Sequence, residues 1–300
     1  MTKQEKMFPA KTSIDTSSDE ILRLREENFR LKALLESHGI SWEVEPDDSL
    51  STQTHSDHMV SLSADQKVTL FRRLFRGRTD VYPTRWKSAK GRSGYSPACG
   101  NEWKPGLCNK PKVKCADCDN RLFLPVTDQV IYDHLSGKHV VGVYPLLEDD
   151  TCYFLAVDFD KSDWKEDSRA FIQSCFELDI PASLEISRSG KGAHVWIFFS
   201  HPVPAREARQ LGAALISYTC DKTRQLSLAS YDRFFPNQDI MPKGGFGNLI
   251  ALPLQKQPRE SGCSVFVDHD LTPYPDQWQY LSSLKPMSAT ELETALLRAR

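Results

Sequence analysis

The segment that most constrains the fold is TCYFLAVDFD at residues 151–160, an apolar run that ends in two carboxylates one residue apart. Such a run is typical of a buried β-strand. Because side chains alternate along a strand, Asp158 and Asp160 project from the same face. Carboxylates that share a face can bridge divalent cations, which suits two-metal phosphoryl chemistry. Taken alone, the pair is also typical of a solvated strand end.

A second segment carries chemistry that complements the first. The residues SRSGKGAHVWIFF at 187–199 combine a Gly-rich basic turn with another apolar strand. Backbone N–H groups of such a turn, with the Ser189 hydroxyl and the Lys191 ammonium, can hold a triphosphate. His194 stands at the entrance to the strand and adds a further donor. Together the two segments predict a nucleotide site beside a metal site.

The order of elements around these motifs predicts an α+β fold. We expect helices from Ser162 or Asp163 to about Leu178 and from Pro204 to about Thr219, and strands at 151–158, 182–187, 193–200 and 248–254. The series is β-α-β-β-α-β, the split arrangement of an RRM-like sheet. In it the first strand lies antiparallel between the third and the fourth, so their polar ends meet at one edge. Asp232, which precedes the last expected strand, is then a third carboxylate of the site or an ordinary loop acid.

The charge distribution points to a polyanionic partner. The formal net charge is −2, yet residues 67–121 hold fourteen Lys/Arg against four Asp/Glu, a net of +10. Residues 1–66 hold seven Lys/Arg against thirteen Asp/Glu, a net of −6. A basic block beside a metal-ready strand end favours binding of nucleic acid. A solvated basic face would have the same composition.

The cysteine pattern predicts a structural metal site. Four of the eight cysteines follow the spacing C-x8-C-x6-C-x2-C, at Cys99, Cys108, Cys115 and Cys118. The closing C-x2-C spacing is typical of structural zinc, and four thiolates would complete a tetrahedral site. Unconnected free cysteines are the alternative. Trp103 and the lysines on the same loops would allow this zinc knuckle to grip nucleic acid.

The rest of the chain divides by composition. Residues 1–17 have a disordered composition, residues 18–40 predict an amphipathic or coiled-coil helix, and residues 41–63 are an acidic, Ser-rich linker. The apolar seam of that helix would support a dimer through residues 18–37 or dock on its own domain; it consists of Ile21, Leu24, Asn28, Leu31 and Leu35.

The remaining segments complete the domain plan. We expect a basic N-terminal part with the zinc knuckle at 64–145, a catalytic palm at 146–275 and a C-terminal helical segment at 276–300. Within the first, a helix from Ala64 should end at Gly77. No apolar run approaches the ~18 residues that span a bilayer, and the N-terminus lacks a signal-peptide core. We therefore expect a cytoplasmic protein without membrane contact.

These motifs carry a family resemblance. D-F-D, S-G-K-G-A-H, and Y-D followed by an Asn-containing segment resemble the three motifs of the archaeo-eukaryotic primase superfamily. Over about residues 70–257, the runs FRGRTDVYP, VYPLLEDDTCYFLAVDFDK, RSGKGAHVWIFF and YDRFFPNQDIMPKGGFGNLIALPLQ resemble the primase domain of TOTE conflict systems, which are prokaryotic mobile-element or phage-defence loci.

The resemblance implies a primase-polymerase, a nucleotidyltransferase that copies single-stranded DNA into RNA or DNA. Its substrates would be nucleoside triphosphates, and its partners would be the template, a primer, and helicase or nuclease modules in cis or in trans. Asp158, Asp160 and Asp232 would bind two Mg²⁺ or Mn²⁺ ions. Ser189, Lys191 and His194 would bind phosphates, helped by Arg188, and Asn248 would contact nucleotide or template.

Two other functions fit the same residues. A catalytically idle scaffold would bind nucleic acid and need neither metal nor nucleotide. A metal-dependent nuclease would use the same carboxylates but has no need of the triphosphate cradle between Ser189 and His194, so nucleotide binding separates it from a polymerase.

Overall fold

The computed structural model describes residues 62–223 and 229–299. The expected disordered segment 1–17, the coiled-coil helix 18–40 and nearly all of the linker 41–63 lie outside the described residues. Among those described, no helix is long and apolar enough to cross a membrane.

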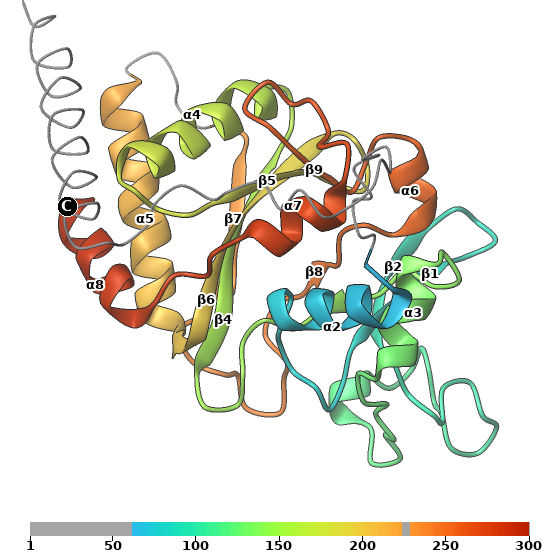
Figure 1. Cartoon of the computed structure of the whole chain (residues 1–300). Coiled ribbons are helices and arrows are strands. Elements are labelled where there is room, and N and C mark those ends of the chain that lie inside the picture. The colour runs from blue at the N-terminus through green and yellow to red at the C-terminus, as the bar shows by residue number, and fades with distance from the viewer. Residues whose placement is uncertain (1–61, 224–228, 300) are drawn as a thin grey trace, which may run out of the picture. The chain divides into compact units, whose positions relative to one another are not determined.

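A five-stranded antiparallel sheet forms the centre of the fold, in the order β7-β4-β6-β5-β9 (Figure 1). Its strands are β4 (Thr151–Asp160), β5 (Ser183–Ile186), β6 (Gly192–Pro204), β7 (Tyr231–Phe235) and β9 (Val265–Val267). The chain order is β4-α4-β5-β6-α5-β7, so the expected split β-α-β-β-α-β arrangement and the mixed α+β class are confirmed.

Helices α4 (Trp164–Glu177) and α5 (Ala205–Lys222) cover one face of this sheet (Figure 1). The Phe159 ring of β4 lies 5.5 Å from the Phe171 ring of α4. In α5, a Cβ on Gly212 would lie only 2.8 Å from the Phe234 ring, so this glycine lets the helix approach β7 closely. The side chains on this face are apolar because the sheet on one side and the helices on the other remove them from water.

The opposite face is covered in part by α2 (Ala64–Leu74), which a capping box starts at Ser63. Phe75, at the end of α2, packs edge-on against Trp196 and Phe198 of β6, with ring centroids 5.0 and 5.3 Å apart. The expectation that Gly77 caps this helix is wrong. The helix ends three residues earlier, and Gly77 instead permits a close approach, because a Cβ there would lie 2.3 Å from the Tyr144 carbonyl oxygen.

The assignment of the fourth strand to residues 248–254 is also wrong. That segment contributes only β8 (Ile250–Ala251), which pairs with β3 (Gly142–Val143) in a separate two-stranded sheet. The strand beside β4 is β7, which contains Asp232. The sequence YDRFF was missed because its charged residues remain partly exposed and only Phe234 and Phe235 are buried.

The remaining elements surround the sheet. A hairpin of β1 (Pro83–Lys87) and β2 (Ser93–Pro97) is followed by the 3-10 helix Cys115–Asp117 and α3 (Asp128–Leu135). The C-terminal part adds α6 (Lys256–Glu260), α7 (Gln277–Ser283) and α8 (Ala289–Arg298). The last two lie in the segment for which helices were expected.

Candidate active site

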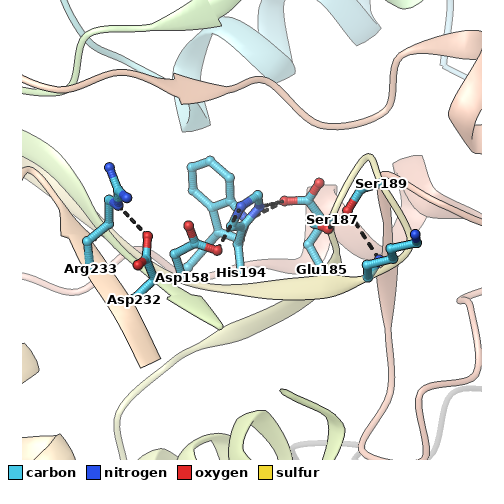
Figure 2. Close-up of polar contacts among 9 residues, drawn as sticks. Asp158, Glu185, Ser187, Ser189, His194, Asp232 and Arg233 are labelled. Atoms are coloured by element: carbon cyan, nitrogen blue, oxygen red, sulfur yellow. Dashed lines mark hydrogen bonds and ion pairs between the residues drawn. The ribbon is translucent and has the colours of Figure 1, made fainter. Parts of the chain in front are cut away.

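Four charged side chains form a row across the sheet (Figure 2). The strand register places Glu185 of β5 opposite His194 of β6, His194 opposite Asp158 of β4, and Asp158 opposite Arg233 of β7. Nδ1 of His194 lies 3.0 Å from the Glu185 carboxylate, and its Nε2 lies 3.6 Å from the Asp158 carboxylate. Charges of opposite sign therefore alternate along the row, an arrangement that stabilises cross-strand pairs.

Glu185 is a member of this row that sequence reasoning missed. Its side chain is 1% exposed and also accepts a 2.8 Å hydrogen bond from the Trp196 indole. Burial alone would lower the pKa of His194, but Glu185 and then Asp158 outweigh it and raise that pKa, which favours the imidazolium. A signal was present, because a carboxylate inside the apolar strand SLEI needs a buried partner.

The two aspartates at the end of β4 are crowded. Burial raises the pKa of Asp158. The neighbouring carboxylates of Asp160 and Asp232 raise it further, whereas His194 and Arg233 counteract the rise. In the described part of the chain, the buried Oδ1 of Asp160 has no hydrogen-bond partner. An unpaired buried carboxylate oxygen beside a second carboxylate fits a divalent cation, which prefers oxygen ligands.

The expected three-carboxylate metal set is not assembled in this geometry. Among the described residues, no three His, Cys, Asp or Glu side chains are placed to ligate one ion. Asp232 lies at the same sheet edge, but its carboxylate pairs with the neighbouring Arg233 guanidinium at 2.5 Å (Figure 2). The structure thus brings Asp158 and Asp160 together and holds Asp232 on an arginine.

The basic turn joins β5 to β6 and lies against the end of β4. Gly190 adopts a φ of 69° and donates a 2.9 Å hydrogen bond to the Ser187 carbonyl. The Ser189 hydroxyl accepts from the Lys191 N–H at 3.2 Å and bonds the Ser187 hydroxyl at 3.1 Å, so it orders the turn itself. A Cβ on Gly192 would lie 2.5 Å from the Phe159 carbonyl oxygen. Glycine there permits the turn and the aspartates to adjoin.

A cavity of about 640 Å³ opens between this turn and the end of β4. Three lysines and a carboxylate meet on its wall, which suits a polyphosphate with its cation. Lys161 and Lys165 were not singled out from the sequence, although Lys161 directly follows D-F-D and Lys165 comes four residues later. The lining consists of Asp160, Lys161, Trp164, Lys165, Ser189, Gly190 and Lys191.

Two expected helpers occupy other positions. Arg188 does not line that cavity; its guanidinium lies near Tyr95 of β2, where it counteracts the rise in the tyrosine pKa caused by burial. The Asn248 amide donates to the Phe234 carbonyl at 2.9 Å and accepts from the Asn237 N–H at 3.2 Å. Asn248 therefore holds the end of β7 and does not begin the neighbouring strand.

The four clustered cysteines line a small cavity of about 20 Å³. Cys99 Sγ accepts a hydrogen bond from the Leu122 N–H at 3.3 Å, and no three of these thiols meet as ligands of one ion within the described residues. The expected zinc knuckle is therefore not supported by this geometry. The thiols surround one cavity without converging on a point.

Comparison with known proteins agrees with these observations. Residues 66–295 match the model of the family described as TOTE conflict system, Archaeo-Eukaryotic Primase domain. Among solved structures, the polymerase domain from Mycobacterium tuberculosis ligase D in complex with DNA is similar, with 12% sequence identity, a TM-score of 0.38, and coverage of 79% of this chain and 88% of that one. We base no functional argument on a likeness of that size. No curated protein matches. Since the family model spans most of its length, the chain belongs to the archaeo-eukaryotic primase domains of TOTE conflict systems.

Proposed function

We propose that this protein is a template-dependent nucleotidyltransferase, a primase-polymerase that extends RNA or DNA strands on single-stranded DNA. One observation carries the proposal. Asp160 at the end of β4, the Ser189–Lys191 turn and two further lysines line one cavity large enough for a nucleotide, and Asp158 precedes Asp160 by two residues on the same strand. Carboxylates for cations and ammonium groups for phosphates thus lie side by side.

The parts have distinct roles in this proposal. Asp158 and Asp160, with Asp232 once it leaves Arg233, would hold Mg²⁺ or Mn²⁺, which would supply Lewis-acid stabilisation of the charge that develops on phosphoryl oxygens. Lys161, Lys165 and Lys191 hold the triphosphate. The 3′-hydroxyl oxygen of a strand would attack the α-phosphorus. One P–O bond forms as the bond from the α-phosphorus to the oxygen bridging to the β-phosphate breaks, pyrophosphate leaves, and the hydroxyl proton passes to water.

His194 and Glu185 position the site. Glu185 fixes the imidazole ring through Nδ1, and the raised pKa of His194 keeps a cation beside Asp158. That cation offsets part of the repulsion among the carboxylates, so the strand end stays folded before nucleotide arrives. The basic block at 67–121 would carry the template and primer.

Wider parts of the proposal rest on sequence alone. Four thiols around one cavity are a suitable donor set for a structural Zn²⁺. Residues 18–37 would form a dimer, and helicase or nuclease modules would act in cis or in trans, in a mobile-element or phage-defence system. Each is testable separately from catalysis.

The deciding experiment is extension and unprimed synthesis on single-stranded DNA with labelled nucleotides and Mg²⁺ or Mn²⁺. We expect Asp158→Ala/Asp160→Ala to lower the rate on the order of 10³-fold, because several kcal/mol of charge stabilisation are lost. Asp270→Ala, which removes a carboxylate that is 83% exposed, is the matched control and should match wild type.

The other outcomes identify the other functions. Aspartate-dependent cleavage of DNA without nucleotide would identify a metal-dependent nuclease. DNA binding that is equal in all variants, with no product under either metal, would identify the idle scaffold.

A further inference from the structure

The β1–β2 hairpin presents an aromatic ring to solvent. Trp86 of β1 is 44% exposed, and its register partner on β2 is Gly94. A Cβ on Gly94 would lie 2.9 Å from Cζ2 and 3.2 Å from Cε2 of the indole. The ring therefore rests directly on the glycine. Any side chain at this position would prevent that contact. Glycine inside a strand costs stability and often marks such a close approach.

The hairpin around this ring is uniformly basic. Residues 81–101 contain Arg85, Lys87, Lys90 and Arg92 and no Asp or Glu. Three of these, Lys87, Lys90 and Arg92, are exposed. Arg85 instead donates to the Ser93 hydroxyl at 3.0 Å and steadies the pairing of the two strands. An exposed ring among free cations attracts an anionic partner that carries flat apolar groups.

The opposite face of the hairpin leads to the nucleotide site. Side chains alternate along a strand, so Arg85 and its register partner Tyr95 face away from Trp86. Tyr95 is near enough to Arg188 for the guanidinium charge to counteract the rise in the tyrosine pKa caused by burial, although the Tyr95 hydroxyl has no hydrogen-bond partner among the described residues. Arg188 belongs to the same turn as Ser189 and Lys191, so one hairpin connects the exposed ring to the proposed phosphate cradle.

We propose that Trp86 is a stacking platform for a base of the single-stranded template, with Lys90 and Arg92 of the hairpin turn on its phosphates. This inference rests on the proposed function, since it names where the template lies. Single-stranded nucleic acid fits because its bases are free to stack, whereas duplex bases are already stacked on each other. A basic surface also gains affinity from release of counterions, which a neutral protein partner does not supply.

The test is binding of a fluorescent oligo-dT to the whole chain, measured by anisotropy without nucleotide or metal. Trp86→Ala should weaken binding about tenfold or more, as loss of one stacked base does. Trp86→Phe should retain most of the affinity because it keeps a ring. Gly94→Ala should weaken binding as well, since its methyl group displaces the indole. Phe176→Ala, at an aromatic residue of α4 that is 78% exposed, should change nothing.

A second measurement tests the cations. Substituting Lys90 and Arg92 by alanine should reduce the slope of log K against log salt by about 1.4, since each single-strand phosphate contact contributes ~0.7. Unchanged binding by Trp86→Ala overturns the inference. So does a wild-type dimer in sedimentation that Trp86→Ala converts to monomer, which would make this face a protein interface.

Failure of the inference and failure of the proposed function are distinguishable. If the wild type extends primers and Trp86→Ala does so with the same KM for template, the polymerase function is supported and the stacking of a template base on Trp86 is contradicted. If wild type binds DNA through Trp86 yet makes no product with either metal, the platform stands and the polymerase function falls.

Discussion

The strand-end site and the cysteine loops are built in opposite ways. Glu185, His194 and Asp158 lie on neighbouring strands whose register alone brings them together, and β4 beneath them is buried. Residues 99–127 contain the four cysteines, and none of these residues is buried. The strand-end region is positioned by sheet pairing and a core, whereas the loops have turn hydrogen bonds and an isolated bridge but no buried residue.

This comparison indicates which of the two regions would need a bound ion for its structure. At the strand end, a metal would serve chemistry, since strand pairing and a buried core hold the sheet. In the loops at 99–127, turns and a few polar contacts such as the Lys110–Glu102 pair at 2.7 Å replace a core. A single partly buried ion pair is weak evidence for stability. We therefore expect the loops, not the sheet, to depend on metal.

The largest effect should come from removing that metal. We expect one Zn²⁺ per chain by elemental analysis, and expect Cys115→Ser/Cys118→Ser to lose it. Structural zinc supplies about 10 kcal/mol in small domains, so amide exchange should rise throughout residues 99–121. The sheet should keep its protection.

A matched control uses Cys175→Ser, at a buried cysteine of α4 outside the cluster. It should retain zinc even if it lowers global stability. If the chain contains no zinc and its residues 99–121 are still protected from amide exchange, the loops do not depend on metal and the contrast with the sheet is wrong.

Acid should loosen the packing of α3, which follows the cysteine loops in the chain. His134 of α3 is buried; its Nε2 lies 2.9 Å from the Pro253 carbonyl, and its Nδ1 accepts from the Val141 N–H at 3.2 Å. Burial lowers its pKa from 6.5 to about 4, only partly offset by the bond to Pro253. The unfolded chain therefore binds more protons between those values, and stability falls as pH decreases.

The free energy of unfolding should fall by about 3 kcal/mol between pH 6.5 and pH 4, and it should be fully restored above pH 6.5. Urea unfolding at a series of pH values measures it. His134→Gln should remove this component, while His139→Gln, at a histidine that is 57% exposed, should leave it in place. A wild-type profile that is flat over this range would contradict the assignment.

The smallest effect concerns the basic turn. Gly190→Ala places a methyl group 2.8 Å from Cys263 Sγ at a positive φ, which costs about 1–2 kcal/mol. Nucleotide affinity should fall by about tenfold, since the turn holds the phosphates. Titration with a labelled nucleotide measures the affinity.

Gly91→Ala is the control, because it shares a positive φ but nothing lies within 4 Å of its Cβ. Equal nucleotide affinity in Gly190→Ala and wild type would show that the turn does not set phosphate binding.

Local patterns predicted much of this fold. The strand at 151–160, the helix after it and the basic turn were recognisable because each is a contiguous run with its own period. The strand containing Asp232 was missed because it is short and half exposed. Lys161 and Lys165 were missed because a partner across a cavity leaves no trace in local spacing. Glu185 stood out as a carboxylate in an apolar strand, but its partner His194 lies on another strand and could not be named from local spacing.

By itself, the sequence determined the chemistry available: two carboxylates on one strand face, a glycine turn that accepts a positive φ, and a basic block before them. The tertiary structure decided which groups meet. It placed β7 beside β4, set Glu185 against His194, directed Arg188 toward Tyr95 and used Asn248 to hold β7. The reason is that a residue's face follows from the local backbone period, whereas its partners follow from the non-local pairing of strands.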